Sequence, residues 1–158
     1  MTGGGGLREA SAMAEIQENW RSIMAVAMGK TPFIVSLGGE IVEVSPARVL
    51  MRLPYAEKLV GDPDTGVVHG GVITAMLDHS CGLAIGSALK SPAPYVTLDL
   101  RIDYMKPARP RADIMFEAEC LKITHEIIFA RGLAFQDNRD DFIARSTGTF
   151  MFSRPQTA

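Results

Sequence analysis

Hydrophobic and polar positions repeat with two different periods along the chain, and these periods divide it into helices and strands. Apolar residues recur every three or four positions over residues 9–28, which predicts an amphipathic helix. Gly29 ends this pattern and Pro32 follows, as is typical after a helix. Residues 70–89 are apolar on nearly every side, so a second helix there needs cover all round.

Period-two alternation and β-rich composition predict six strands. Two of them precede the second helix, at residues 39–44 and 48–53, and are joined by the turn Ser45-Pro46-Ala47. Short connections between the remaining four predict that they follow one another as antiparallel neighbours. Those four segments are 97–104, 113–123, 127–136 and 142–152. We therefore expect an α+β fold, in which one antiparallel sheet of five to six strands curls around the long helix.

The elements suggest three parts, which are a disordered tail or cloning remnant at residues 1–6, a helix at 7–29 and a single domain at 30–158. The net charge of −2 gives no reason to expect nucleic acid or an anionic membrane as a partner. No uninterrupted apolar run reaches 18 residues, and the first residues lack the order of a signal peptide. The only cysteines, Cys81 and Cys120, lack metal-ligand spacing, which indicates free thiols in a reducing cytoplasm.

One carboxylate, Asp78, lies in the middle of the apolar helix. Its neighbours on the same helix face include Thr74, Cys81 and Ile85, none of which carries a positive charge. A buried and unpaired carboxylate is costly. Asp78 therefore either has a backbone or hydroxyl partner in the core, or it lines a functional cleft, which we favour because such cost is tolerated at sites.

The sequence His69-Gly70-Gly71 precedes this helix. The first N–H groups of a helix have no acceptor within it, and the helix dipole is positive there. Glycine also lets a ligand approach the backbone closely. Gly70 is therefore a candidate donor to a carbonyl oxygen in an oxyanion hole, although the two glycines could equally serve only to make a turn.

Gly70 and Asp78 are too far apart to act on one bond within one chain. Their eight-residue separation corresponds to about 12 Å along a helix. A nucleophile and an oxyanion donor must both lie within about 3 Å of the reacting group. Two antiparallel helices from two chains bring the groups together, so catalysis by both residues predicts at least a dimer, with two sites across the interface.

Three segments resemble the hotdog-fold acyl-CoA thioesterases, and the match extends over about residues 33–152. They are "VVHGGVITAMLDHSCGLAI", "VTLDLRIDYMKPARP" and "ARSTGTFMF". Within this family, the segments resemble the phenylacetate-degradation type, related to 4-hydroxybenzoyl-CoA thioesterase. The resemblance implies a curved sheet around one helix, dimers or tetramers with sites at the dimer interface, and hydrolysis of acyl-CoA to a carboxylic acid and coenzyme A. It implies no metal or redox cofactor.

The resemblance also implies roles for individual residues. Asp78 attacks the thioester carbonyl or activates a water, Gly70 of the partner subunit polarises that carbonyl, and Thr97 holds the acid or the water. His69 and Gly71 line the site. Many relatives carry an asparagine six residues before the histidine, where this chain has Pro63. Asp64 is the nearest substitute, and it offers no amide donor.

Other ionisable residues have a functional and a structural interpretation. Arg109 and Arg111, with Lys106 in the same loop, could bind the phosphates of coenzyme A or form an ordinary solvated turn. His79 points about 100° away from Asp78 around the helix, which favours a packing or interface role. Cys81 has no base nearby and is expected to be a packing residue.

Two other functions remain open at this level. An acyl-thioester hydratase or dehydratase would share the fold, but its Asp and His usually lie about five residues apart in a loop, whereas Asp78 and His79 are adjacent. A non-catalytic acyl-CoA sensor is the alternative from a different class. The sequence does not specify the acyl group or distinguish a dimer from a tetramer.

Overall fold

The structure is a computed structural model that describes residues 19, 22–23, 26, 31–89 and 93–153. The predicted tail at 1–6 lies outside these residues, and so does most of the predicted helix at 7–29. Residues 19, 22, 23 and 26, the described positions in that segment, are helical. Among the described residues, no helix combines the length and the hydropathy that crossing a bilayer requires.

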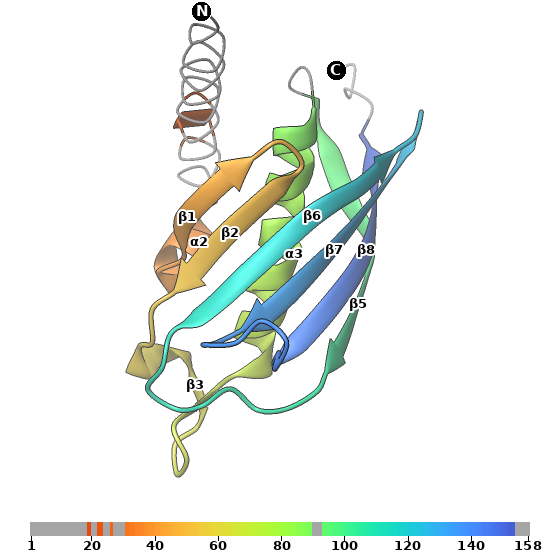
Figure 1. Cartoon of the computed structure of the whole chain (residues 1–158). Coiled ribbons are helices and arrows are strands. Elements are labelled where there is room, and N and C mark those ends of the chain that lie inside the picture. Colours follow the sequence, from red (N-terminus) through yellow and green to blue (C-terminus); the bar gives the residue numbers. More distant parts are fainter. Residues whose placement is uncertain (1–18, 20–21, 24–25, 27–30, 90–92, 154–158) are drawn as a thin grey trace, which may run out of the picture.

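Six strands form one antiparallel sheet in the order β1-β2-β6-β7-β8-β5. Their bounds are Glu40–Ser45 for β1, Arg48–Leu53 for β2, Tyr95–Tyr104 for β5, Ile114–Ile123 for β6, Ile127–Phe135 for β7 and Ala144–Phe152 for β8. Figure 1 shows the sheet curving around a single long helix, α3, which lies against one of its faces. The expected α+β architecture is confirmed.

The helix α3 spans Gly70–Ala88 and supplies the centre of the core. Its side chains Met76, Leu77 and Ile85 are fully buried. On the sheet, alternate residues such as Phe116 and Phe150 point toward the helix and are buried as well. The residues between them face away from α3, so the sheet has an apolar inner face and a largely charged outer face.

The order of the strands corrects one sequence-based prediction. The last four strands do not form a meander, because β5 pairs with β8 and not with β6. A strand has only two edges, and β6 uses one for β7 and the other for β2. The connection over residues 105–113 therefore carries the chain past the end of the sheet, and β5 becomes an edge strand.

Four short elements were not predicted. The helix α2, Pro32–Leu37, has proline at its start and ends at Gly38, whose φ of 88° is in the left-handed region that glycine tolerates. The segment before α3 contains a 3₁₀ turn, Glu57–Leu59, and a small hairpin of β3, Val60–Asp62, and β4, Val67–Val68. Elements of two to six residues are too short to show a reliable period.

The close approach of α3 to β7 depends on Gly132, and replacing this glycine should destabilise the protein. A Cβ at position 132 would lie 2.6 Å from Ser146 Oγ and 3.0 Å from Leu77 Cδ2. Both neighbours are fully packed, so Gly132→Ala should cost about 1–3 kcal/mol of unfolding free energy. Thermal denaturation should show a melting temperature lower by roughly 3–10 °C, and an unchanged value would contradict this account of the packing.

Candidate active site

The Asp78 carboxylate lies where the middle of α3 passes the edge strand β5. Thr97 Oγ1 on β5 donates a hydrogen bond of 3.0 Å to Asp78 Oδ1. Thr97 pairs with the buried Phe150 on β8, so its side chain points to the inner face of the sheet, where α3 lies. The structure therefore brings together two of the predicted catalytic residues, which lie 19 positions apart in the sequence.

This carboxylate opens into a surface pocket of about 490 Å³. Apolar residues supply much of its lining, including Leu83, Ala93 and Phe150. Asp78 is half-buried, whereas Thr97 is exposed. The reason is that β5 is an edge strand and leaves the flank of the helix uncovered. An acid with one hydroxyl partner at the base of an apolar hollow suits chemistry on an apolar acyl group.

The Thr97 hydroxyl should contribute to activity through this single bond. Thr97→Val keeps the shape and strand propensity of the side chain but removes the donor to a charged oxygen, a change of about 1.5–3 kcal/mol. We expect kcat/KM for thioester hydrolysis to fall by about tenfold or more, whereas Thr97→Ser should retain most of the activity. Equal kcat/KM values for the two variants would show that the hydroxyl has no role.

The first turn of α3 contains the second predicted group. His69 caps the helix, and its Nδ1 accepts a bond of 2.9 Å from the Gly71 N–H. The His69 carbonyl accepts a bond of 2.9 Å from Val72 N–H. The remaining donor in this turn, Gly70 N–H, has no hydrogen-bond acceptor among the residues that the structure describes. A backbone N–H without an acceptor at the start of a helix is available to bind an oxyanion.

The small hairpin β3–β4 positions this turn. Gly61 on β3 packs so closely that a Cβ there would lie 2.8 Å from His69 Cα. Asp64 lies at the exposed tip of the hairpin, where its N–H donates to Asp62 Oδ1 over 3.1 Å. Hydrogen bonds from Thr65 and Asp64 lower the pKa of Asp62. The hairpin thus connects Asp64 to the Gly70 end of the helix, not to Asp78 of the same chain.

The basic loop between β5 and β6 lies at the Gly70 end of the molecule, but two of its cations already have carboxylate partners. Arg109 donates to Asp137 Oδ2 over 2.6 Å, and Lys106 forms an ion pair with Asp141. Arg111 is exposed, with a left-handed φ of 56°. Lys106 also lines a hollow of about 330 Å³ beside Gly70. A phosphate bound here would compete with the existing ion pairs.

Two further helix residues can be assigned from their surroundings. Burial raises the pKa of the Cys81 thiol to about 12, so this residue is not a thiolate and is a packing residue, as predicted. His79 lines the same pocket as Asp78, although the spacing had placed the two side chains on different faces. Its Nε2 is buried without a hydrogen-bond partner in the described part of the chain. Burial lowers the pKa of His79, and the nearby Asp78 only partly opposes this.

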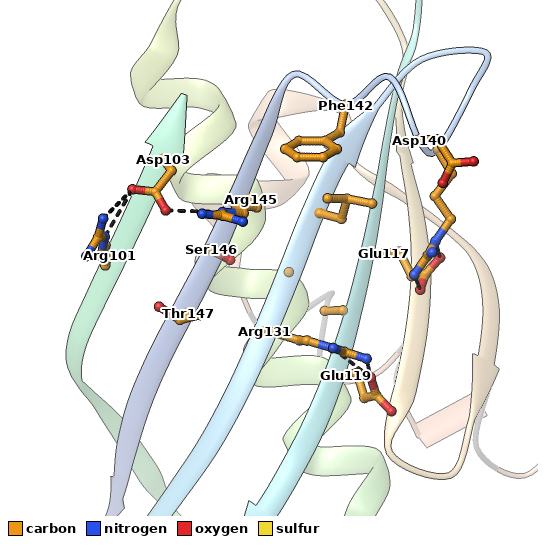
Figure 2. Close-up of a pocket in the computed structure, with 14 residues that line it drawn as sticks. Arg101, Asp103, Glu117, Glu119, Arg131, Asp140, Phe142, Arg145, Ser146 and Thr147 are labelled. Carbon is orange, nitrogen blue, oxygen red and sulfur yellow. Dashed lines mark hydrogen bonds and ion pairs between the residues drawn. The ribbon is translucent and has the colours of Figure 1, made fainter. Parts of the chain in front are cut away.

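Another hollow, of about 670 Å³, lies elsewhere, on the outer face of the sheet (Figure 2). Apart from Asp140, its charged side chains form ion pairs with one another. Asp103 pairs with Arg101 and Arg145, Glu119 pairs with Arg131, and Glu117 pairs with Arg139. The arginines lower the pKa values of Asp103 and Glu117. Because these carboxylates are committed to arginine partners, we place the chemistry at Asp78.

The edge strand β5 carries an exposed apolar surface beside the Asp78 pocket. Val96 is 48% exposed and Leu98 is 52% exposed, on a strand whose second edge has no partner within the described chain. A bulge between Thr97 and Asp99 interrupts the pairing with β8. An unpaired strand edge with apolar side chains is a surface suited to pairing with another chain.

Comparisons with known proteins agree with this geometry. The family model of the Thioesterase superfamily matches residues 65–143, which are 79 of the 158 residues. A crystal structure from Pseudomonas aeruginosa is 37% identical with a TM-score of 0.74, and the match covers 87% of this chain and 99% of that one.

Two relatives compared by sequence carry functional names. A protein of Halobacterium salinarum named as an esterase is 37% identical over 90 residues, which are 55% of this chain and 58% of the length of that protein. The medium/long-chain acyl-CoA thioesterase of Salmonella typhimurium is 27% identical over 133 residues, or 76% of this chain and 84% of that protein. The chain thus spans little more than half of the first of these relatives.

The matched residues include the helix start, the acid-bearing helix, β5, β6 and β7. The Pseudomonas aeruginosa protein is covered almost from end to end. With its six-stranded antiparallel sheet wrapped around α3 in a hotdog fold, the chain belongs to the Thioesterase superfamily.

Proposed function

We propose that the protein hydrolyses acyl-CoA thioesters to a free carboxylic acid and coenzyme A. The observation that carries this proposal is the Asp78 carboxylate, held by Thr97 at the base of an apolar pocket. The Gly70 N–H without an acceptor and the acyl-CoA thioesterase relative support the same reaction.

The proposed reaction uses the residues in a fixed order. Asp78 removes a proton from water, whose oxygen adds to the thioester carbonyl carbon, or the carboxylate itself adds to that carbon. The carbonyl oxygen gains negative charge, which the Gly70 N–H and the positive end of the helix stabilise. The C–S bond then breaks and coenzyme A leaves as a thiolate, a good leaving group that needs no strong general acid. Where the carboxylate itself has attacked, water then hydrolyses the mixed anhydride, which releases the carboxylic acid and restores Asp78.

We further propose that each site combines Asp78 of one subunit with Gly70 of its partner. Eight residues along α3 separate these groups by about 12 Å, too far for one carbonyl to contact both within a chain. The exposed edge of β5 beside Asp78 supports pairing of two sheets there. A dimer would then hold two sites, and a tetramer of two such dimers would hold four.

The substrate range and surroundings follow from the same proposal. The apolar pocket wall suits aliphatic and aromatic acyl groups alike. The motifs resemble the phenylacetate-degradation branch, whereas the relative from Salmonella typhimurium is named for medium and long chains. Arg109 and Arg111 are the candidates for the coenzyme A phosphates. Both cysteines are free, which is consistent with a reducing cytoplasm.

A panel of acyl-CoA substrates tests the proposal. Acetyl-, octanoyl-, palmitoyl- and phenylacetyl-CoA would be supplied to the full chain, and release of free thiol followed with a thiol-reactive dye. We expect turnover with at least one member. Tight binding without thiol release would identify a non-catalytic acyl-CoA sensor, and hydration of an enoyl-CoA without thiol release would identify a hydratase.

A further inference from the structure

The glycine pair at the start of α3 is held more firmly than its sequence suggests. Glycine has the greatest backbone freedom of all residues, so two in succession would leave the direction of the Gly70 N–H poorly defined. Catalysis by an oxyanion donor requires the opposite, because the amide must already point at the reacting oxygen. Some part of the chain must therefore fix this turn.

Tyr104, at the end of β5, reaches the turn from outside the helix. Its hydroxyl donates a hydrogen bond of 2.7 Å to the Gly70 carbonyl. The Thr74 hydroxyl lies 2.7 Å from the same tyrosine oxygen and 3.3 Å from the Gly70 carbonyl. Since the tyrosine proton is used on Gly70, the shorter distance assigns the Thr74 proton to Tyr104. The three groups form a chain of bonds from Thr74 through Tyr104 to Gly70, in which each bond strengthens the next.

The peptide units on both sides of Gly70 are consequently fixed. The unit that follows Gly70 is bound at its carbonyl by Tyr104 and at its N–H by His69 Nδ1. The unit that precedes it is bound at its carbonyl by Val72 N–H. The hydroxyl and ring of Tyr104 also lie 3.5 Å and 3.7 Å from the position of a Cβ on Gly70, and Tyr104 lines the adjoining hollow. Of the two N–H groups and two carbonyls in these peptide units, Gly70 N–H is then the one without a hydrogen-bond partner in the described chain.

We propose that Tyr104 is a positioning residue for the oxyanion donor, which acts by fixing the Gly70–Gly71 peptide through its hydroxyl. This inference rests on the proposed thioesterase function. Tyr104 does not contact the reacting atoms, and its effect should pass entirely through the direction of the Gly70 N–H.

Tyr104→Phe removes the hydroxyl and keeps the ring, so it is the direct test. We expect kcat for the best acyl-CoA substrate to fall by about tenfold, with KM changed less than about twofold. The decisive measurement is a double-mutant cycle with Gly70→Pro, which lacks the N–H. In the Gly70→Pro background, Tyr104→Phe should lower kcat no further, because the group that it positions is already absent.

Tyr95→Phe is the matched comparison. Tyr95, at the other end of β5, donates a bond of 2.8 Å to the Gly82 carbonyl of the same helix. Both variants lose a strand-to-helix bond, and because the Tyr95 bond is the more buried of the two, Tyr95→Phe should lower the melting temperature at least as much as Tyr104→Phe. Whatever its own effect on kcat, Tyr95→Phe should combine additively with Gly70→Pro.

Two results would overturn the inference. The first is a wild-type kcat in Tyr104→Phe, and the second is an additive loss when Tyr104→Phe is combined with Gly70→Pro. Absence of thiol release by the wild-type protein is a different outcome, because it would remove the proposed function before any variant is compared.

Discussion

Asp78→Asn should lower kcat for acyl-CoA hydrolysis by about 10³-fold while the protein still folds and binds substrate. The amide has nearly the same shape as the carboxylate, and its oxygen can still accept the bond from Thr97 Oγ1. It can neither remove a proton from water nor attack the thioester as an anion. Because the change replaces a half-buried charge by a neutral group, the melting temperature should not fall.

Steady-state thiol release would measure this loss, and binding of a non-hydrolysable thioether analogue would show that the pocket is intact. Asp99→Asn is the matched control. Asp99 lies two residues from Thr97 on the same strand, but it pairs with Thr149 and faces the outer side of the sheet. This control should keep wild-type turnover. If Asp78→Asn kept it as well, the assignment of the acid would be wrong.

Gly70→Pro should lower kcat by about 10²–10³-fold, which is the effect typical of removing one oxyanion donor. Proline lacks the N–H but is well tolerated at the first position of a helix. The preceding residue, His69, has φ −61° and ψ 132°, a conformation that a following proline accepts. Gly70→Ala keeps the N–H, and its Cβ would meet only ordinary contacts with Tyr104 at 3.5–3.7 Å.

Comparison of these two variants separates the amide from the side chain. Gly70→Ala should stay within about threefold of the wild type, as expected of a substitution without strain. Circular dichroism should show the same helix content in both. Equal kcat values for the proline and alanine variants would mean that the Gly70 N–H does not stabilise the oxyanion.

Mixing the two inactive variants tests whether the site crosses between subunits. In a mixed dimer of Asp78→Asn and Gly70→Pro chains, one of the two sites would combine an intact Asp78 with an intact Gly70. Random assortment makes half of the dimers mixed, so co-refolded protein should recover about a quarter of the wild-type activity. If both groups acted within one chain, the mixture would remain inactive.

The sequence was sufficient for the long helix and the six strands of the main sheet, but not for the short elements or for the order of the strands. Apolar periodicity placed the long helix within one residue of its observed end and the strands within about two residues. The edge position of β5 could not be predicted, because it depends on β2 occupying the free edge of β6, a contact between segments about 70 residues apart. Loop lengths report only on neighbours in sequence.

The candidate site shows the same limit. The free amide of Gly70 follows from the general rule that helix starts lack acceptors, so it could be predicted locally. The bond between Thr97 and Asp78 depends on the register of β5 across its bulge, and only the family resemblance indicated it. Tyr104 was not singled out, because nothing in an alternating strand marks which residue reaches the helix start.

The position of β5 also affects how the protein is made. Within the sheet, the only neighbour of β5 is β8, which spans Ala144–Phe152 and is translated about 40 residues later. While the chain emerges from the ribosome, the strand that carries Thr97 and Tyr104 therefore has no β-partner, although α3 has already been synthesised. Its exposed Val96 and Leu98 make it a target for chaperones or for association with other nascent chains during this interval. The strand that places Thr97 beside Asp78 is thus held in the sheet only after the last strand has been added.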